Sequence, residues 1–301
     1  MRKVTVAATQ MACSPNKSEN VHNAEKLIKE AAAKGANIIL LQELFETQYF
    51  CQVVNSEFFK MASPFEGNET IEFFAELAKD LDVVIPVSFY EVTGQTRFNS
   101  LVVIDADGKI LDLYRKTHLP DDPGYYEKYY FSPGDTGFKV WDTKYAKIGV
   151  GICWDQWFPE TARSLALKGA ELLFFPTAIG TLVTPKGEPY DEPEVYDHWQ
   201  NTMLGHAAAN MTPVIASNRI GIESFEETSI KFGGNSFISD QKGNIIVSAD
   251  RDSEAILTAT FDLDELEAYR RYVPLFRDRR PEHYKTLLTL DGKKSCLVEN
   301  I

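Results

Sequence analysis

The sequence predicts a layered α/β sandwich built from a single domain of residues 1–301. Three observations support this fold class. Short apolar runs of strand length alternate with segments of helical spacing, pairs of strands follow one another closely, and no linker or change in composition divides the chain. A chain of 301 residues, 44% of them hydrophobic, is long enough to bury a large core. The adjacent strand pairs favour a mixed sandwich over an all-parallel sheet.

The first half of the chain contains strand and helix signals in turn. Lys3–Thr9 alternates as a strand, Asn20–Ala33 has helical spacing, and residues 37–42 form a short apolar run typical of a buried strand. A second helix is predicted from about Thr70 to Leu81. The strands predicted after it are Val83–Phe89, Ser100–Ile104 and Ile110–Tyr114.

The second half repeats this order and ends in several strands. Lys147–Ile152 is predicted as a strand and Pro159–Lys168 as a helix with proline in its first turn. The segment Thr181–Glu194, rich in proline, is predicted to be a surface loop, and a C-terminal tail is expected from about residue 272. The other predicted strands are Leu172–Phe175, Pro213–Ser217, Gly234–Ile238, Asn244–Val247 and Ala255–Phe261, and the other predicted helices are Val195–Asn210 and about Asp264–Arg271.

Composition argues against several classes of function. A net charge of −13 disfavours nucleic acid and anionic membrane surfaces as partners, and no apolar run is long enough for a membrane span. The histidines and cysteines form no metal-ligand spacing, so neither a metal nor another cofactor is expected. The isolated cysteines and the lack of a signal-peptide pattern at the start predict a cytoplasmic protein.

Three polar residues directly follow predicted buried strands. Glu43 follows Ile-Ile-Leu-Leu-Gln, Lys116 follows Ile-Leu-Asp-Leu-Tyr-Arg, and Cys153 follows Ile-Gly-Val-Gly-Ile. Ligand sites of α/β sheets form at the carboxyl ends of strands. By position alone, the cysteine could equally be an inert core residue, and the two charged residues could be solvated strand ends.

The chemistry of these three side chains suits covalent acyl transfer. A thiolate is a strong nucleophile for an amide carbon, Glu43 could take the thiol proton and later activate water, and Lys116 could stabilise the oxyanion. The helix predicted from Pro159 would place the positive end of its dipole near Cys153 and favour the thiolate.

Three segments around these residues resemble the signature segments of the nitrilase superfamily. They read Leu41-Gln-Glu-Leu-Phe45, Tyr114-Arg-Lys-Thr-His-Leu-Pro120 and Gly149-Val-Gly-Ile-Cys-Trp-Asp155, in the order and separations of the family. The resemblance extends from residue 3 to about residue 290. It implies a four-layer α-β-β-α sandwich of the nitrilase type.

The resemblance also implies roles for site residues. Glu43 would be the general base, Lys116 the oxyanion stabiliser and proton donor, and Cys153 the nucleophile. The stretch from Tyr126 to Asp135 resembles the segment that carries the second glutamate of the family. That match implies that Glu127 positions the substrate and Lys116.

The residues after the nucleophile indicate the substrate class. Relatives that hydrolyse N-carbamoyl amino acids carry arginines there, which bind the substrate carboxylate, whereas this chain reads Asp155-Gln-Trp-Phe158. The segment from Cys153 to Glu160 instead resembles the branch of the family that hydrolyses N-carbamoylputrescine in polyamine biosynthesis. That resemblance implies a small cationic carbamoyl amine as substrate. The alternatives are another N-carbamoyl amine or amino acid, or an aliphatic amide.

The distal ammonium of such a substrate needs a carboxylate or aromatic faces. We expect Trp154, Tyr49 and Thr177 to contact the substrate, with Trp157 as a further possible wall. The sequence leaves the carboxylate open among Asp155, Glu188, Asp191, Glu192, Glu194 and Asp197.

Other readings of the chain are weaker. A papain-like pair would need His118, His198 or His206 beside Cys153, but the Glu-Lys-Cys pattern already supplies base and charge, so His118 is expected to be structural and His206 a hydrogen-bonded core histidine. Acyl transfer to an amine and a non-catalytic interaction protein are the two remaining classes. The family resemblance implies that the tail with the basic patch Phe276–Tyr284 crosses a two-fold interface, which predicts a homo-oligomer built from a dimer.

Overall fold

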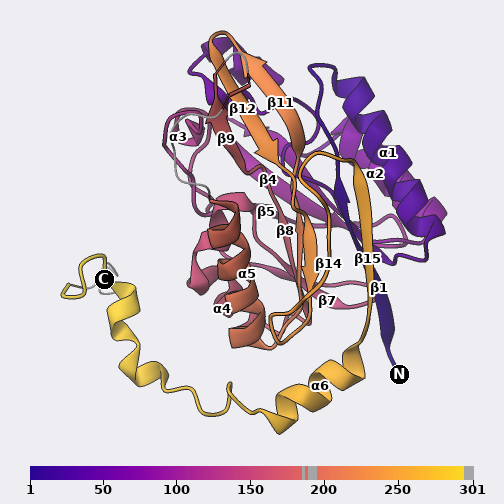
Figure 1. The fold of residues 1–301 in the computed structure, drawn as a ribbon, viewed down its shortest axis with the longest axis vertical. Coiled ribbons are helices and arrows are strands. Elements are labelled where there is room, and N and C mark those ends of the chain that lie inside the picture. Colours follow the sequence, from indigo (N-terminus) through magenta and orange to yellow (C-terminus); the bar gives the residue numbers. More distant parts are fainter. Residues whose placement is uncertain (185–186, 189–194, 295–301) are drawn as a thin grey trace.

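The computed structural model describes residues 1–184, 187–188 and 195–294, which form two β-sheets packed face to face with helices on both outer sides (Figure 1). In the first sheet β15, β1 and β2 are neighbours, and main-chain bonds between β2 and Val84 join them to β3, β4 and β5. Its strands are β1 (Lys3–Gln10), β2 (Ile38–Leu40), β3 (Ile85–Thr93), β4 (Thr96–Ile104), β5 (Ile110–Arg115) and β15 (Ala255–Asp262).

The second sheet has the order β14-β13-β10-β8-β7-β6. Its central strands β7, β8 and β10 are parallel, and antiparallel strands flank them. The strands are β6 (Val140–Asp142), β7 (Lys147–Val150), β8 (Leu172–Pro176), β10 (Val214–Ser217), β13 (Phe237–Ser239) and β14 (Ile245–Ser248).

Two pairs of helices form the outer layers. Helices α1 (Lys17–Ala33) and α2 (Glu69–Leu81) cover the first sheet, and each begins after an asparagine whose side chain accepts N–H groups of the first turn. Helices α4 (Pro159–Leu167) and α5 (Tyr196–Asn210) cover the second sheet (Figure 1). The remaining helices are α3 (Glu127–Tyr130), α6 (Leu263–Tyr272) and the 3₁₀ turns Phe50–Gln52, Ser56–Met61, Cys153–Trp157, Pro281–His283 and Lys285–Leu288.

Side-chain alternation along the strands separates the layers. In β2, Ile38 and Leu40 belong to the core between the sheets, whereas Ile39 packs in the core shared with α1 and α2. Leu101 and Val102 of β4 alternate in the same way. The predicted four-layer α-β-β-α sandwich is therefore confirmed.

A third, small sheet differs from the sequence-based prediction. It consists of β9 (Gly180–Val183), β12 (Thr228–Gly233) and β11 (Ile220–Phe225). The prediction that a loop starts at Thr181 was wrong for its first residues, because β9 forms by pairing with β12, which is distant in sequence. Residues 185–186 and 189–194 of that predicted loop lie outside the described residues.

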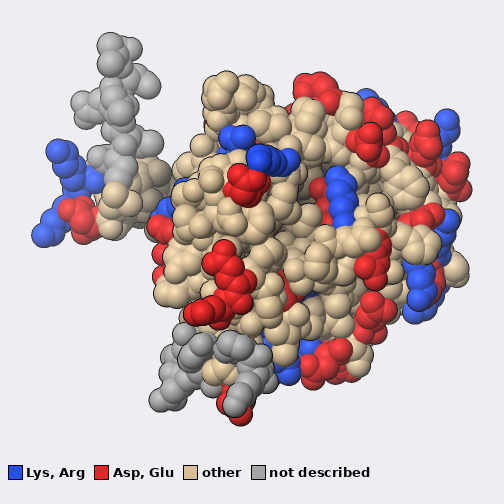
Figure 2. Space-filling view, turned by 90° about the horizontal axis from the view of Figure 1, so that it is seen from above, with Lys and Arg blue, Asp and Glu red and all other residues tan. Residues whose placement is uncertain are grey.

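The chain after α6 leaves the body of the sandwich (Figure 1). Large apolar side chains on it are exposed, among them Leu287 and Leu290. On the face seen in Figure 2, acidic and basic side chains are interspersed, so the net negative charge forms no single patch there. Among the described helices, none is long and apolar enough to cross a membrane.

Candidate active site

The three predicted catalytic residues follow the ends of strands in the structure. Strand β2 ends at Leu40, β5 at Arg115 and β7 at Val150, which places Glu43, Lys116 and Cys153 just beyond them. Glu43, Lys116 and Glu127 are at most 1% exposed, and Cys153 is 5% exposed. Ionisable groups at this depth need partners, because an unpaired buried charge is costly.

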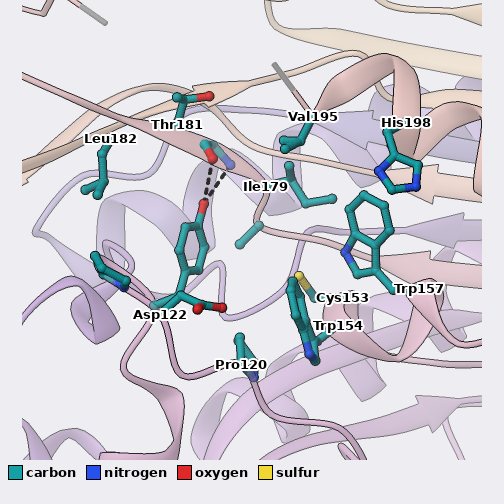
Figure 3. A pocket seen from close by; sticks show the side chains of 14 residues that line it. Pro120, Asp122, Cys153, Trp154, Trp157, Ile179, Thr181, Leu182, Val195 and His198 are labelled. Carbon is teal, nitrogen blue, oxygen red and sulfur yellow. Dashed lines mark hydrogen bonds between the residues drawn. The ribbon is translucent and has the colours of Figure 1, made fainter. Parts of the chain in front are cut away.

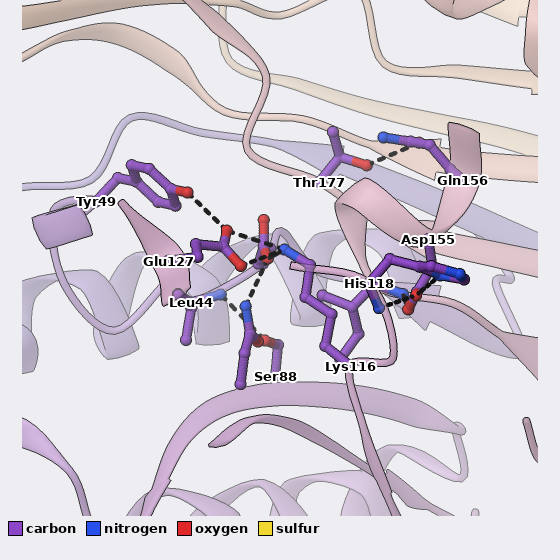
Figure 4. Close-up of polar contacts among 12 residues, drawn as sticks. Leu44, Tyr49, Ser88, Lys116, His118, Glu127, Asp155, Gln156 and Thr177 are labelled. Carbon is purple, nitrogen blue, oxygen red and sulfur yellow. Dashed lines mark hydrogen bonds and ion pairs between the residues drawn. The ribbon is translucent and has the colours of Figure 1, made fainter. Parts of the chain in front are cut away.

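The Lys116 ammonium is the centre of the site (Figure 4). Its Nζ lies 2.7 Å from Glu43 Oε1, 2.9 Å from Glu127 Oε1 and 2.7 Å from Glu127 Oε2. An ammonium has three donors, and these contacts use all of them. Burial opposes the charged form, but the two carboxylates outweigh it and hold the pKa of Lys116 well above its usual range. Lys116 is therefore a fixed positive charge.

The two oxygens of Glu43 have different surroundings. Oε1 accepts hydrogen bonds from Lys116 and, at 2.7 Å, from the Asn99 side-chain amide. Oε2 is buried and has no hydrogen-bond partner among the described residues. A buried carboxylate oxygen without a hydrogen-bond partner is rare because it is energetically unfavourable. We therefore regard Oε2 as the oxygen that is free to accept a proton during a reaction.

Glu127 is the first residue of α3 and completes the buried cluster. Besides the Lys116 ammonium, it accepts a hydrogen bond from the Tyr49 hydroxyl at 2.6 Å. Burial raises the pKa of Glu127 to about 7, opposed by Lys116 and supported by the nearby Glu43. The cluster can therefore hold a proton near neutral pH.

Cys153 lies at a sharp turn, with φ of 41°, in the left-handed region that non-glycine residues rarely adopt. Burial raises the pKa of its thiol, the negative charge of Glu43 raises it further, and Lys116 opposes both. The expectation that the helix dipole favours a thiolate is therefore wrong for the resting site. Helix α4 begins at Pro159 as predicted, but a short 3₁₀ turn separates it from the thiol, and burial dominates.

Asp155 supports this turn and does not face the substrate side. It is 0% exposed, and its carboxylate accepts hydrogen bonds from Ile152 N, His118 N and the Tyr114 hydroxyl at 3.0, 2.9 and 2.7 Å. The His118 ring lies 2.8 Å from the same carboxylate and stacks on Phe158. Asp155 thus joins the segment of Lys116 to the turn of Cys153, which removes it from the candidates for the substrate ammonium.

The other two histidines of interest occupy different environments. His206 Nε2 lies 2.8 Å from the main-chain oxygen of Gln156 inside the core, which confirms the predicted hydrogen-bonded core histidine. His198 is exposed and packs edge-on against Trp157. None of the described hydrogen bonds joins a histidine to Cys153.

A pocket of about 440 Å³ opens above Cys153 (Figure 3). Its walls are mostly apolar and aromatic. The hydroxyl of Tyr125 on one wall is held by both main-chain groups of Gly180. The lining residues are Pro120, Asp122, Pro123, Tyr125, Cys153, Trp154, Trp157, Ala178, Ile179, Gly180, Thr181, Leu182, Val195 and His198.

Asp122 is the single carboxylate among the described lining residues, and that lining contains no lysine or arginine. It lies across the pocket from Trp157 and His198 (Figure 3). Sequence reasoning missed Asp122. The available signal was its turn, Asp-Asp-Pro-Gly, which comes just after the segment of Lys116 and therefore returns near the same sheet edge.

The residues predicted to contact the substrate separate into two groups. Trp154 lines the pocket, whereas Tyr49 is directed to Glu127, and the Thr177 hydroxyl lies 3.2 Å from both Gln156 Oε1 and Phe175 O. Glu188 and Asp197 are exposed and do not line the pocket described above. The remaining candidates, Asp191, Glu192 and Glu194, lie outside the described residues.

Comparison with known proteins agrees with this geometry. Residues 5–271 match the family model described as carbon-nitrogen hydrolase. An N-carbamoylputrescine amidase of Oryza sativa subsp. japonica is 57% identical over 97% of both chains, and a citrullinase of Francisella tularensis is 50% identical over 96% of this chain and 99% of its own length. The crystal structure of a carbon-nitrogen hydrolase from Helicobacter pylori G27 aligns with a TM-score of 0.87 at 38% identity, covering 96% of this chain and 99% of that chain. The chain with this Glu-Lys-Cys site belongs to the carbon-nitrogen hydrolase family.

Proposed function

We propose that this protein hydrolyses N-carbamoylputrescine to putrescine, carbon dioxide and ammonia, as a step of polyamine biosynthesis. One observation carries the choice of substrate: the apolar, aromatic pocket above Cys153 has one described carboxylate, Asp122, and no described cationic lysine or arginine. Such a wall suits a butyl chain that ends in an ammonium. The similarity to plant N-carbamoylputrescine amidases supports the same choice.

In the acylation half-reaction, Cys153 Sγ attacks the carbamoyl carbon while Glu43 Oε2 takes the thiol proton. This order of events suits a thiol that burial keeps protonated at rest. The developing oxyanion is stabilised by the Lys116 charge and by N–H groups at the start of the 3₁₀ turn, which a helix leaves unpaired. Glu43 then returns the proton to the leaving nitrogen, and the carbamoyl group remains on Cys153 as a thiocarbamate.

In the deacylation half-reaction, Glu43 takes a proton from water, and the resulting hydroxide attacks the thiocarbamate carbon. The tetrahedral intermediate expels Cys153, which recovers its proton from Glu43. The carbamic acid that is released decomposes to carbon dioxide and an amine or ammonia. Glu127 holds Lys116 in place through both half-reactions by its two short contacts with the ammonium.

Citrulline is a second candidate substrate, because it carries the same carbamoyl group and a citrullinase is among the relatives. Its distal end has a carboxylate beside the ammonium. A buried carboxylate is best held by arginine or lysine, and the described lining offers neither. The pocket therefore favours the purely cationic substrate.

Steady-state release of ammonia from N-carbamoylputrescine, citrulline and N-carbamoyl-β-alanine tests this proposal. We expect kcat/KM for N-carbamoylputrescine to exceed the others by at least about tenfold, the size of one well-placed charge interaction. Faster turnover of N-carbamoyl-β-alanine or of citrulline would overturn the choice of substrate while leaving the reaction type intact.

We also propose that the protein is a cytoplasmic homo-oligomer built from a dimer. The chain beyond α6 presents exposed apolar side chains, Leu287 at 63% and Leu290 at 96%, as is typical of surfaces that contact another chain. A reducing compartment would keep the nucleophilic thiol of Cys153 free. Light scattering of the full chain and of a chain that ends at Val273 tests the assembly: the full chain should have at least twice the monomer mass, and the shortened chain a lower mass.

A further inference from the structure

Behind the catalytic glutamate lies a second buried ion pair that the mechanism above does not use. Arg219, between β10 and β11, is 0% exposed, and Glu223 of β11 is 1% exposed. Arg219 Nη1 lies 2.8 and 3.1 Å from the two carboxylate oxygens of Glu223. Arginine is always charged, so this pair brings a permanent cation into the interior next to the site.

Most of the remaining donors of Arg219 go to the main chain around Glu43. Nη2 donates to the carbonyl oxygens of Glu43 at 2.8 Å and Leu44 at 2.7 Å, and Nη1 donates to Thr47 O at 3.2 Å. The guanidinium therefore binds the segment that carries the proposed general base at three main-chain carbonyls.

The turn after Glu43 contains a strained residue and therefore needs support from its surroundings. Leu44 has φ of 47°, a left-handed conformation that a leucine rarely adopts, and its N–H donates to Ser88 Oγ on the other side. A strained residue directly after Glu43 would relax if its carbonyl lost its partner. Relaxation at Leu44 would rotate the Glu43 side chain relative to Cys153.

The same ion pair also reaches Glu127. Glu223 Oε2 accepts the main-chain N–H of Tyr49 at 2.5 Å, and the Tyr49 hydroxyl donates to Glu127. The two carboxylates around Lys116 are thus anchored to one buried pair, Glu43 directly through its backbone and Glu127 through Tyr49.

From this geometry we infer that Arg219, oriented by Glu223, is a positioning residue that fixes the Glu43 carboxylate for proton transfer with Cys153. The inference rests on the role proposed for Glu43 but not on the identity of the substrate. Arg219 touches no reacting atom. Substitution of Arg219 should therefore lower the rate of the chemical step and leave substrate binding unchanged.

The first test compares Arg219→Lys with Arg270→Lys. Arg270 is a matched control, since its guanidinium also donates to two carbonyls, of Met211 and Glu171, but it lies on α6 and does not line the pocket above Cys153. We expect Arg219→Lys to lower kcat on N-carbamoylputrescine by about 10²-fold with KM changed less than about threefold, the effect of a misplaced catalytic group. Arg270→Lys should leave both constants within about twofold.

The second test asks whether Arg219 acts through Glu43. Alkylation of Cys153 by iodoacetamide, followed by peptide mass spectrometry, needs no substrate and so separates this inference from the choice of substrate. We expect Arg219→Lys and Glu43→Gln each to slow alkylation, and the double variant to be no slower than Glu43→Gln alone. Independent, multiplying effects would overturn the inference, as would an unchanged kcat in folded Arg219→Lys.

Should Arg219→Lys fail to fold, Glu223→Gln keeps the inference testable. It retains the shape of the pair and leaves Arg219 in place, but removes the charge that orients the guanidinium. We expect a smaller fall in kcat of the same kind, with KM unchanged. A Glu223→Gln enzyme with wild-type kcat at a temperature where it is fully folded would contradict the positioning role.

Discussion

The buried cluster of Glu43, Lys116, Glu127 and Cys153 differs in construction from the pocket wall that faces it. The cluster is at most 5% exposed, and contacts of 2.7 to 2.9 Å join Glu43 and Glu127 to the Lys116 ammonium. Glu43, Lys116 and Cys153 each lie just beyond a strand end. The wall combines the turn of Asp122 with the 3₁₀ turn Cys153–Trp157, strand β9 and helix α5, and its one described carboxylate, Asp122, is exposed. We therefore expect the sandwich to set the reaction type, and exposed wall segments such as the turn of Asp122 to set the choice of substrate.

The largest expected effect follows from removing Cys153, the proposed nucleophile of the cluster. Cys153→Ala removes the covalent thiocarbamate pathway, so kcat on N-carbamoylputrescine should fall by about 10⁴-fold or more. Because the wall is untouched, the variant should still bind the substrate, with a Kd by calorimetry close to the wild-type value. Unchanged ammonia release from Cys153→Ala would refute the covalent mechanism.

The next effect concerns the support of the cluster. Asp155→Asn leaves a buried amide where three hydrogen-bond donors and the His118 ring now meet a carboxylate, and should lower the free energy of unfolding by about 2–4 kcal/mol. Urea unfolding at constant protein concentration measures this. Asp142→Asn is the control. The Asp142 side chain is 83% exposed and pairs with Lys147 at the surface, so the change should alter the free energy of unfolding by less than about 0.5 kcal/mol. Similar losses in both variants would show that Asp155 is not a central support.

These two regions were not equally predictable from the sequence. Glu43, Lys116 and Cys153 could be found because each lies just beyond a strand that local periodicity predicts, and because the segments around them resemble the signature segments of the nitrilase superfamily. The role of Asp122 depends on where a loop lies relative to Cys153, which no local pattern contains. Arg219 contacts the carbonyl of Glu43 across 176 residues, so it too becomes visible only after folding.

Long-range pairing also explains the errors in the fold. The layers and most strands were predicted, but β9 was assigned to a loop because its partner β12 lies far along the chain. The thiolate expectation for Cys153 failed for a related reason: the helix start was visible in the sequence, but the burial that dominates the thiol pKa was not.

A smaller effect tests whether Asp122 on the pocket wall binds the ammonium of the substrate. Asp122→Asn should raise KM for N-carbamoylputrescine about tenfold, or about 1.4 kcal/mol, and leave kcat nearly unchanged. N-butylurea, which lacks the ammonium, should show no such change. Asp121→Asn is the matched control, since Asp121 is the exposed neighbour and does not line the pocket. An equal loss with N-butylurea would mean that Asp122 shapes the wall and does not bind the charge.

The smallest effect tests the proton held in the cluster. Burial raises the pKa of Glu127 to about 7, above the value of about 4.3 for a free glutamate, so between these values the folded state binds a proton that the unfolded state has lost. The contribution of this group to stability is therefore present at low pH and is lost as pH rises through about 7. From pH 6 to pH 7.5 the free energy of unfolding of the wild type should fall by about 1 kcal/mol more than that of Glu127→Gln, which cannot titrate.

Urea unfolding at several pH values measures that difference, with Glu57→Gln as a control at an exposed glutamate that should keep the wild-type slope. If the free energy of unfolding depends on pH in the same way for the wild type and Glu127→Gln, the proton is not bound by Glu127. A steeper wild-type curve would mean that the buried cluster binds a proton near neutral pH. It would also assign this part of the pH dependence of stability to the buried cluster and not to the exposed pocket wall.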